Sequence, residues 1–164
     1  MAQASPKGRS MPKGRIMNEA DSVLKLTRRF QAPREAVFRA FTVAEELKAW
    51  WGPKGFTCPV AQLDVRPGGR YHIEMLSPDG NIFKLDGEFR EVTSPSRLVY
   101  TWTWGEGDMA GLETLVTLEF RDLGADGTEL SLTHEMLPGA EWVERHEHGW
   151  SGGFDRLAEV LAAA

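Results

Sequence analysis

The sequence predicts an α+β fold in which an antiparallel sheet packs against one long C-terminal helix. Between residues 60 and 136, short segments alternate apolar and polar residues, as half-buried strands do. Short turns rich in glycine and proline join these segments, which indicates hairpins rather than the helical crossovers of a parallel sheet. After residue 140 the apolar residues recur at helical spacing instead.

The chain before the hairpins predicts one strand and two short helices. Residues 23–30 alternate with Leu24 and Leu26 on the inward face. Pro33 then stands near the start of a helix, where its missing N–H costs nothing. A second short helix is expected over residues 44–50, because Gly52 and Pro53 follow it and end helices strongly.

Six further strands are expected to form a meander, because adjacent antiparallel strands need only short turns. One of them carries three large rings on one face, namely Tyr100, Trp102 and Trp104. Such a face is either ordinary core or the wall of a ligand cavity. The six segments are residues 60–65, 71–76, 82–92, 98–104, 114–121 and 128–136.

The last element is predicted to be a helix over residues 141–161. Its apolar stripe recurs at spacings of four, three and four. Three glycines interrupt the same helix, each costing about 1 kcal/mol relative to alanine. Either another segment approaches the helix backbone closely at these glycines, or the helix gives way around a pocket. The stripe is Trp150, Phe154, Leu157 and Leu161, and the glycines are Gly149, Gly152 and Gly153.

The composition is that of a single globular domain. The chain has 164 residues, 41% hydrophobic and 26% charged, with a formal net charge of −5. We expect residues 1–21 to be a disordered basic tail and residues 22–164 to be the domain. The negative charge argues against nucleic acid, and no apolar run predicts a membrane span or a signal peptide. A cytoplasmic location is therefore expected. Cys58 is the sole cysteine, so an intrachain disulfide is excluded.

The order of these elements is the order that a helix-grip fold requires. In that fold a curved antiparallel sheet wraps a C-terminal helix and leaves a cavity between them. Several motifs, collinear from the first strand to the last helix, are similar to those of the START-like (SRPBCC) superfamily. Within it they resemble the branch of the activator of heat-shock protein 90 ATPase. They lie at residues 32–38, 50–53, 64–69, 95–102, 147–150 and 154–157.

The resemblance implies binding of an apolar or amphipathic small molecule in the cavity. It implies no shared catalytic constellation and no cofactor. The chaperone-activating members of the branch carry a further N-terminal domain that a chain of this length does not accommodate. That difference argues against a chaperone as the partner here.

The candidate site residues are those that this fold directs toward the cavity. Most are apolar or aromatic, as in typical small-molecule sites, with Tyr71, Tyr100 and His134 as the polar groups. The alternative for each is that it simply fills the core. The expected ligand-binding residues are Tyr71, Ile73, Met75, Phe89, Tyr100, Trp102, Trp104, Leu118, Leu132, His134, Trp150, Phe154 and Leu157. Trp50, Trp51 and Phe56 are expected to form a gate at its mouth.

Three functions remain open from the sequence. The first is a binding protein for an apolar or aromatic small molecule, with a stress-related role left open. The second is a cyclase-type or hydrolase-type enzyme with His134 and Tyr100 as acid–base groups. The third is an interaction module, acting on a chaperone or as a homodimer. A metal site is not expected, because His146 and His148 lie two residues apart on a helix and face different directions.

Overall fold

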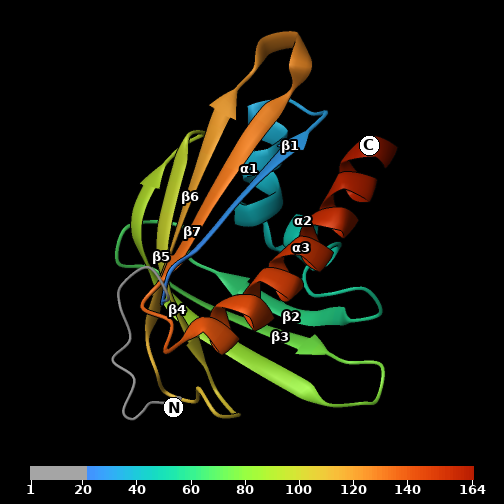
Figure 1. The fold of residues 1–164 in the computed structure, drawn as a ribbon. Coiled ribbons are helices and arrows are strands. Elements are labelled where there is room, and N and C mark those ends of the chain that lie inside the picture. The colour runs from blue at the N-terminus through green and yellow to red at the C-terminus, as the bar shows by residue number, and fades with distance from the viewer. Residues whose placement is uncertain (1–21) are drawn as a thin grey trace.

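The computed structural model describes residues 22–164, and the tail expected over residues 1–21 lies outside them. Seven strands form one antiparallel sheet in the order β1-β7-β6-β5-β4-β3-β2. Figure 1 shows the long helix α3 crossing one face of this curved sheet, with the short helices α1 and α2 on the same side. The predicted α+β helix-grip arrangement is therefore confirmed.

Every predicted helix and strand is present, with small differences at the ends. The strand expected from residue 60 begins at Thr57, and the helix expected to reach residue 50 ends at Lys48. In chain order the elements are β1 (Leu24–Phe30), α1 (Arg34–Thr42), α2 (Ala44–Lys48), β2 (Thr57–Leu63), β3 (Arg70–Leu76), β4 (Ile82–Thr93), β5 (Arg97–Trp104), β6 (Thr114–Asp122), β7 (Thr128–Glu135) and α3 (Ala140–Ala163).

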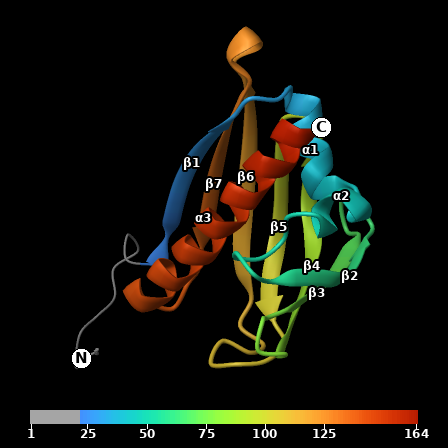
Figure 2. The same cartoon turned by 90° about the vertical axis from the view of Figure 1, so that its right-hand side faces the viewer.

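The packed core lies between the C-terminal half of α3, α1 and the strands around β1. Phe154 and Leu157 of α3 are fully buried. The Phe154 ring meets Phe30 of β1 edge-on at 6.0 Å and Phe41 of α1 at 6.5 Å between centroids. In Figures 1 and 2 the C-terminal end of α3 lies at the same end of the molecule as α1. The N-terminal half of α3 thus extends over a part of the sheet that α1 does not cover.

Two of the three glycines of α3 face the segment after α2. A Cβ at Gly152 would lie 3.4 Å from the Pro53 backbone, and one at Gly153 would lie 3.5 Å from the Trp50 ring. A Cβ at Gly149 would meet no atom within 4 Å. A methyl group would therefore make ordinary van der Waals contact with the segment after α2 at the first two glycines and would face open space at the third.

The aromatic strand β5 is more buried than a half-exposed strand. Tyr100 and Trp102 are buried as expected, but Thr101 between them is buried as well. Its hydroxyl accepts a hydrogen bond from the Glu88 backbone N–H at 2.8 Å, where β4 departs from regular pairing. Its carbonyl accepts one from the Tyr71 hydroxyl at 2.5 Å. Because the Thr101 hydroxyl and carbonyl both have hydrogen-bond partners, the residue can be buried. The prediction that the outer face of this strand is half exposed is wrong at this residue.

Candidate functional site

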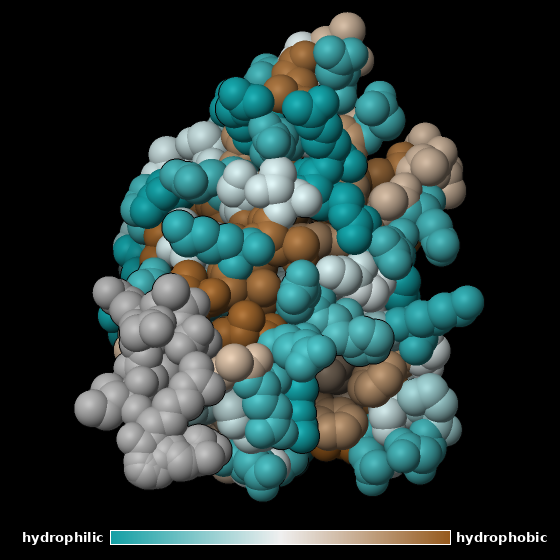
Figure 3. Space-filling view, viewed as in Figure 1, coloured by the Kyte–Doolittle hydropathy of each residue, from teal (hydrophilic) through white to brown (hydrophobic). Residues whose placement is uncertain are grey.

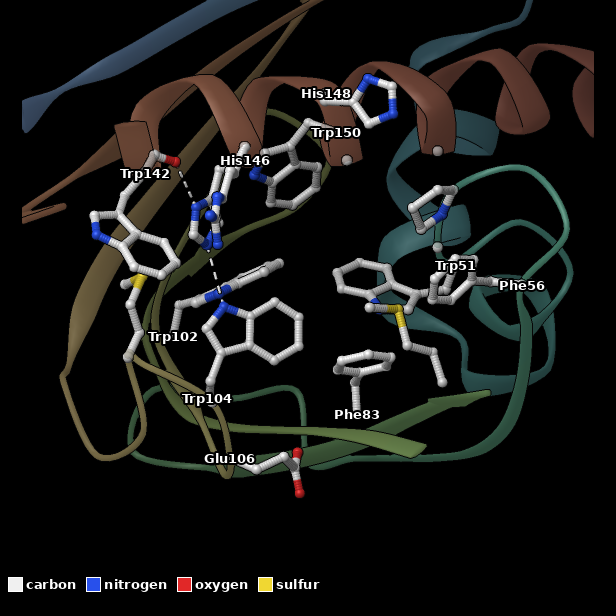
Figure 4. Close-up of a pocket in the computed structure, with 18 of the residues that line it drawn as sticks. Trp51, Phe56, Phe83, Trp102, Trp104, Glu106, Trp142, His146, His148 and Trp150 are labelled. Atoms are coloured by element: carbon white, nitrogen blue, oxygen red, sulfur yellow. Dashed lines mark hydrogen bonds between the residues drawn. The ribbon is translucent and has the colours of Figure 1, made fainter. Parts of the chain in front are cut away.

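A cavity of about 610 Å³ lies between the N-terminal half of α3 and the sheet. Its other walls are the segment after α2 and the loop between β5 and β6. The chain has six tryptophans, and all six line this cavity. They are Trp50, Trp51, Trp102, Trp104, Trp142 and Trp150. Figure 4 labels all of them except Trp50.

Regular secondary structure places most of these rings. Trp102 and Trp104 are two residues apart on β5, so they share the face that the period of a strand dictates. Trp142 and Trp150 are eight residues apart on α3, which returns them to one side of the helix. Phe83 of the neighbouring strand β4 lies on the same side of the cavity as Trp104.

Three of the rings pack against one another at the centre of the wall. The Trp102 ring lies 5.1 Å from Trp150 and 5.8 Å from Trp51 between centroids, and Trp51 meets Trp150 at 5.7 Å. Trp104 adds an edge-to-face contact with Trp102 at 5.4 Å. Aromatic pairs in such arrangements contribute about 0.5–1.5 kcal/mol beyond burial. The wall is therefore a mutually supported cluster rather than a set of independent side chains.

His146 holds Trp104 in place from α3. The Trp104 indole N–H donates to Nε2 of His146 at 3.1 Å (Figure 4). Nδ1 of His146 lies 2.7 Å from the Trp142 carbonyl oxygen, which only accepts, so Nδ1 carries the proton. Both ring nitrogens of His146 are thus engaged, and the tautomer follows from the partners.

His134 holds Trp150 in the same way from β7. The Trp150 indole N–H donates to Nδ1 of His134 at 3.2 Å, so Nε2 carries the proton and donates to the Thr114 hydroxyl at 2.8 Å. Thr114 in turn donates to the Trp102 carbonyl oxygen at 3.0 Å. The chain of donors and acceptors is complete without an added proton.

Burial keeps both imidazoles neutral. Burial, together with the nearby His146, holds the pKa of His134 well below its ordinary value of 6.5. Burial also lowers the pKa of His146, although its bond to the Trp142 carbonyl opposes that shift. Their acceptor lone pairs are occupied by indole N–H groups. The two histidines therefore position tryptophans and leave no free lone pair to remove a proton from a substrate.

Arg156 fixes the segment that follows α2. Its guanidinium Nη1 donates to three successive backbone carbonyls, those of Trp51, Gly52 and Pro53, at 3.1, 3.0 and 3.3 Å. The Trp50 indole N–H donates to the Ala40 carbonyl at 3.0 Å. These bonds tie the wall formed by the two adjacent tryptophans to α3 and α1.

Charged and exposed residues line the cavity mouth. Glu106 and Asp108 come from the loop between β5 and β6, and Arg145 and His148 come from α3. Arg145 is paired with Glu141 at 2.8 Å, and its guanidinium lies 4.7 Å above the Trp142 ring. In Figure 3, hydrophobic surface is visible in a recess in the lower half, with hydrophilic residues around it. The cavity thus combines aromatic walls with a polar rim.

The structure brings about half of the sequence-predicted site residues to the cavity wall. Four of the predicted ligand-binding residues line it, and so do all three of the predicted gate. These seven are Met75, Trp102, Trp104, Trp150, Trp50, Trp51 and Phe56. Five others lie in the packed core without lining the cavity, namely Leu118, Leu132, His134, Phe154 and Leu157.

The remaining four predicted residues gather on the other side of Trp51. Tyr71, Ile73, Phe89 and Tyr100 surround a void of about 10 Å³ that Trp51 also borders. A space of that size holds at most about one water molecule. Burial raises the pKa of both tyrosines, so their hydroxyls stay protonated. Neither Tyr100 nor His134 lines the larger cavity, so the proposed acid–base pair does not converge there.

Several residues that line the cavity are not among the predicted site residues, although the sequence pattern indicates some of them. Phe83 has the same parity on its strand as Phe89, which the sequence pattern directs toward the cavity. Trp142 and His146 extend the stripe of Trp150 backwards in steps of four. Met109 and the loop residues Glu106 and Asp108 carry no periodic signal. In the part of the chain described, no three His, Cys, Asp or Glu side chains are placed to hold a metal ion.

A curved antiparallel sheet that holds a C-terminal helix beside an aromatic cavity defines a START-like (SRPBCC) class of protein. A family model described as "Activator of Hsp90 ATPase homolog 1-like protein" matches residues 31–162. The chain belongs to this family. Among residues 22–164, no helix is long and apolar enough to span a membrane.

Solved structures agree with this assignment. The AHSA1 protein from Silicibacter pomeroyi is 31% identical, with a TM-score of 0.76 over 87% of this chain and 99% of that chain. A protein from Chromobacterium violaceum is 30% identical, with a TM-score of 0.75 over 85% and 96%. An HSP90 activator from Plasmodium falciparum is 26% identical, with a TM-score of 0.68 over 86% and 96%. No curated protein matches the chain.

Proposed function

We propose that this protein binds an apolar, aromatic small molecule in the tryptophan-lined cavity. The observation that carries the proposal is the gathering of all six tryptophans on the wall of one 610 Å³ space. Small-molecule sites are typically concave and mostly apolar, with volumes of about 300–1,000 Å³ and a few polar groups. Exposing the apolar surface of an indole ring to water is unfavourable in free energy. A cavity with this lining therefore favours an apolar occupant.

The cavity wall is held in shape before any ligand enters. Three of the six indole N–H groups donate to His134, His146 and the Ala40 carbonyl oxygen. A preorganised wall lowers the entropic cost of binding, because few side chains must be ordered when the ligand arrives. This favours a binding role over a simple packing defect of the core.

Titration with N-phenyl-1-naphthylamine, a neutral fluorescent probe, tests the proposal. We expect a blue-shifted rise in probe fluorescence, quenching of the tryptophans, and a dissociation constant on the order of micromolar. Because every tryptophan borders the cavity, the protein's own emission reports on the site. Absence of both signals at saturating probe would overturn the proposed function.

Gly149 offers a matched pair of variants for the same titration. It lines the cavity, and a side chain there meets no atom within 4 Å. Gly149→Leu is expected to block probe binding, whereas Gly149→Ala retains it. Both variants remove a helical glycine and are expected to be at least as stable as the wild type. Unchanged probe affinity in Gly149→Leu would place the probe elsewhere on the protein.

Action on a chaperone is a second candidate function. It is favoured by the likeness to the Plasmodium falciparum HSP90 activator, at 26% identity over most of both chains. ATP hydrolysis by purified Hsp90, measured with increasing amounts of this protein, tests it. Stimulation of ATP hydrolysis supports the chaperone function. If a preparation that binds the probe does not stimulate Hsp90, the chaperone function is contradicted and only the binding function stands.

A further inference from the structure

We propose that the natural ligand is an organic cation. Its apolar body occupies the tryptophan-lined cavity, and its ammonium group lies at the mouth beside Glu106 and Asp108. This inference rests on the proposed function and adds the charge of the ligand to it. Three features of the mouth carry it, namely its unpaired carboxylates, the position of Glu106 and the ring faces beside them.

The charges at the mouth do not balance. Glu106 and Asp108 both line the cavity and are exposed. Within residues 22–164 neither of them forms an ion pair. Arg145, the one arginine of the lining, is already paired with Glu141 at 2.8 Å. Among the residues that line the cavity, two carboxylates therefore stand against one arginine, and the formal charge of the lining is negative.

The Glu106 carboxylate is held at the opening. Its Oε1 accepts a hydrogen bond from the Lys84 backbone N–H at 2.6 Å. The Gly105 N–H donates to the Lys84 carbonyl at 2.8 Å, so the loop leaves β5 still attached to β4. In Figure 4 the carboxylate lies below the gap between the rings of Trp104 and Phe83. A cation leaving the cavity on that side would meet Glu106 first.

The aromatic lining also suits a cation at the mouth. The face of an indole ring attracts a positive charge, and tryptophan does so more strongly than phenylalanine or tyrosine. The protein already shows this contact, because the Arg145 guanidinium lies 4.7 Å above the Trp142 ring. An ammonium near Trp104 would gain a second contact of that kind together with the two carboxylates. An anionic group would be repelled by the same carboxylates.

Three ligands of one shape test the charge. They are (1-naphthylmethyl)trimethylammonium, its neutral isostere 1-neopentylnaphthalene, and the anion 1-naphthylacetate. Isothermal titration calorimetry of the full chain measures the affinity of each. We expect the cation to bind more weakly as salt rises from about 20 mM to about 500 mM, and the neutral isostere to be indifferent to salt.

Variants of the carboxylates locate the effect. In the double variant Glu106→Gln/Asp108→Asn, the dissociation constant of the cation is expected to rise about 5- to 10-fold, while that of the neutral isostere stays the same. The control is Asp126→Asn/Glu159→Gln, which removes the same charge from exposed positions. Asp126 lies in the turn between β6 and β7 and Glu159 near the end of α3, and neither lines the cavity. The control is expected to change no affinity.

The outcomes separate the two proposals. If none of the three ligands binds, the proposed function and this inference fall together. Two results would overturn only the inference. In the first, the neutral isostere binds and the dissociation constant of the cation is the same for the wild type and the mouth variant. In the second, the anion binds more tightly than the cation. Loss of cation affinity in the mouth variant, without loss in the control, supports it.

Discussion

Replacing His134 with leucine tests whether buried imidazoles hold the aromatic wall. The side chain is fully buried, and its two nitrogens are bonded to the Trp150 indole N–H and the Thr114 hydroxyl. Leucine is of similar size but accepts no hydrogen bond. The substitution therefore leaves a buried indole N–H without an acceptor while changing the packed volume little.

The structure sets the size of the effect. An unsatisfied buried donor costs about 1–3 kcal/mol, and the lost bond to Thr114 adds up to about 1 kcal/mol. Thr114 keeps its own bond to the Trp102 carbonyl, so its hydroxyl is not stranded. We therefore expect His134→Leu to lower the free energy of unfolding by about 1–4 kcal/mol.

A double-mutant cycle with Trp150→Phe isolates the bond itself. Phenylalanine removes the indole N–H that His134→Leu leaves unpaired, so the second substitution is expected to cost about 1–2 kcal/mol less in the leucine background. Urea denaturation followed by far-ultraviolet circular dichroism measures all four proteins without relying on the altered tryptophan. Trp50→Phe serves as the control, because its indole N–H is bonded to Ala40 instead. Additive effects in the His134–Trp150 cycle would refute the bond.

The same bond predicts an acid dependence. The folded-state pKa of His134 lies well below its ordinary value of 6.5. The contribution of the neutral imidazole to folding stability is therefore fully present above about pH 6.5. As the pH falls below about 6.5, the unfolded chain takes up a proton that the folded protein excludes, and stability is lost. His134→Leu removes that contribution, so the stability difference between the two proteins is expected to narrow on acidification. A wild-type His134 that titrates near 6.5 by nuclear magnetic resonance would contradict this.

Three further predictions concern other parts of the fold. Both ring nitrogens of His72 lie 2.7 Å from carboxylates, those of Asp86 and Glu74, and these bonds raise its pKa. The stabilisation is therefore complete below about pH 6.5 and is lost as the pH rises through the raised pKa, so His72→Gln is expected to match the wild type only at alkaline pH in urea denaturation. Arg156→Met is expected to lower stability by about 1–3 kcal/mol and weaken probe binding, because three carbonyls lose a charged donor, and Arg156→Lys retains part of both. Burial raises the pKa of the Cys58 thiol to about 11, so iodoacetamide at pH 8 is expected to label it only after denaturant is added, and rapid labelling of the native protein would contradict its burial.

The fold could be predicted because its periodicities are strong and local. The alternation around Trp102 specifies which face of that strand is buried, and the four-three-four stripe from Trp150 does the same for the helix. Glycine-rich turns mark the hairpins. The order of elements then left few topologies, since parallel crossovers were excluded. What local pattern does not specify is the pairing of the first strand with the last. That pairing places Leu24 opposite His134 and depends on contacts far apart in the chain.

The site could be predicted only in part, because parity shows which face a residue occupies and not what covers it. Tyr71 and Trp104 both point to the concave side by that rule, yet they border different spaces. The difference arises from Trp51, which borders both spaces and separates them. Its position depends on Arg156, more than 100 residues away, so no local pattern encodes it.

The hydrogen bonds of the tryptophans explain why so apolar a space stays open. Six indoles around a void would gain contact area by collapsing into it, and burial of apolar surface favours collapse by about 25 cal/mol per Å². Collapse is opposed where an indole must keep a buried acceptor. Trp50, Trp104 and Trp150 are each fixed by one such bond, to a backbone carbonyl or to a neutral histidine. Moving any of them inward would leave a buried donor unpaired, at a cost of about 1–3 kcal/mol. The polar contacts behind the rings therefore maintain the cavity, and the neutral state of His134 and His146 is a condition for it.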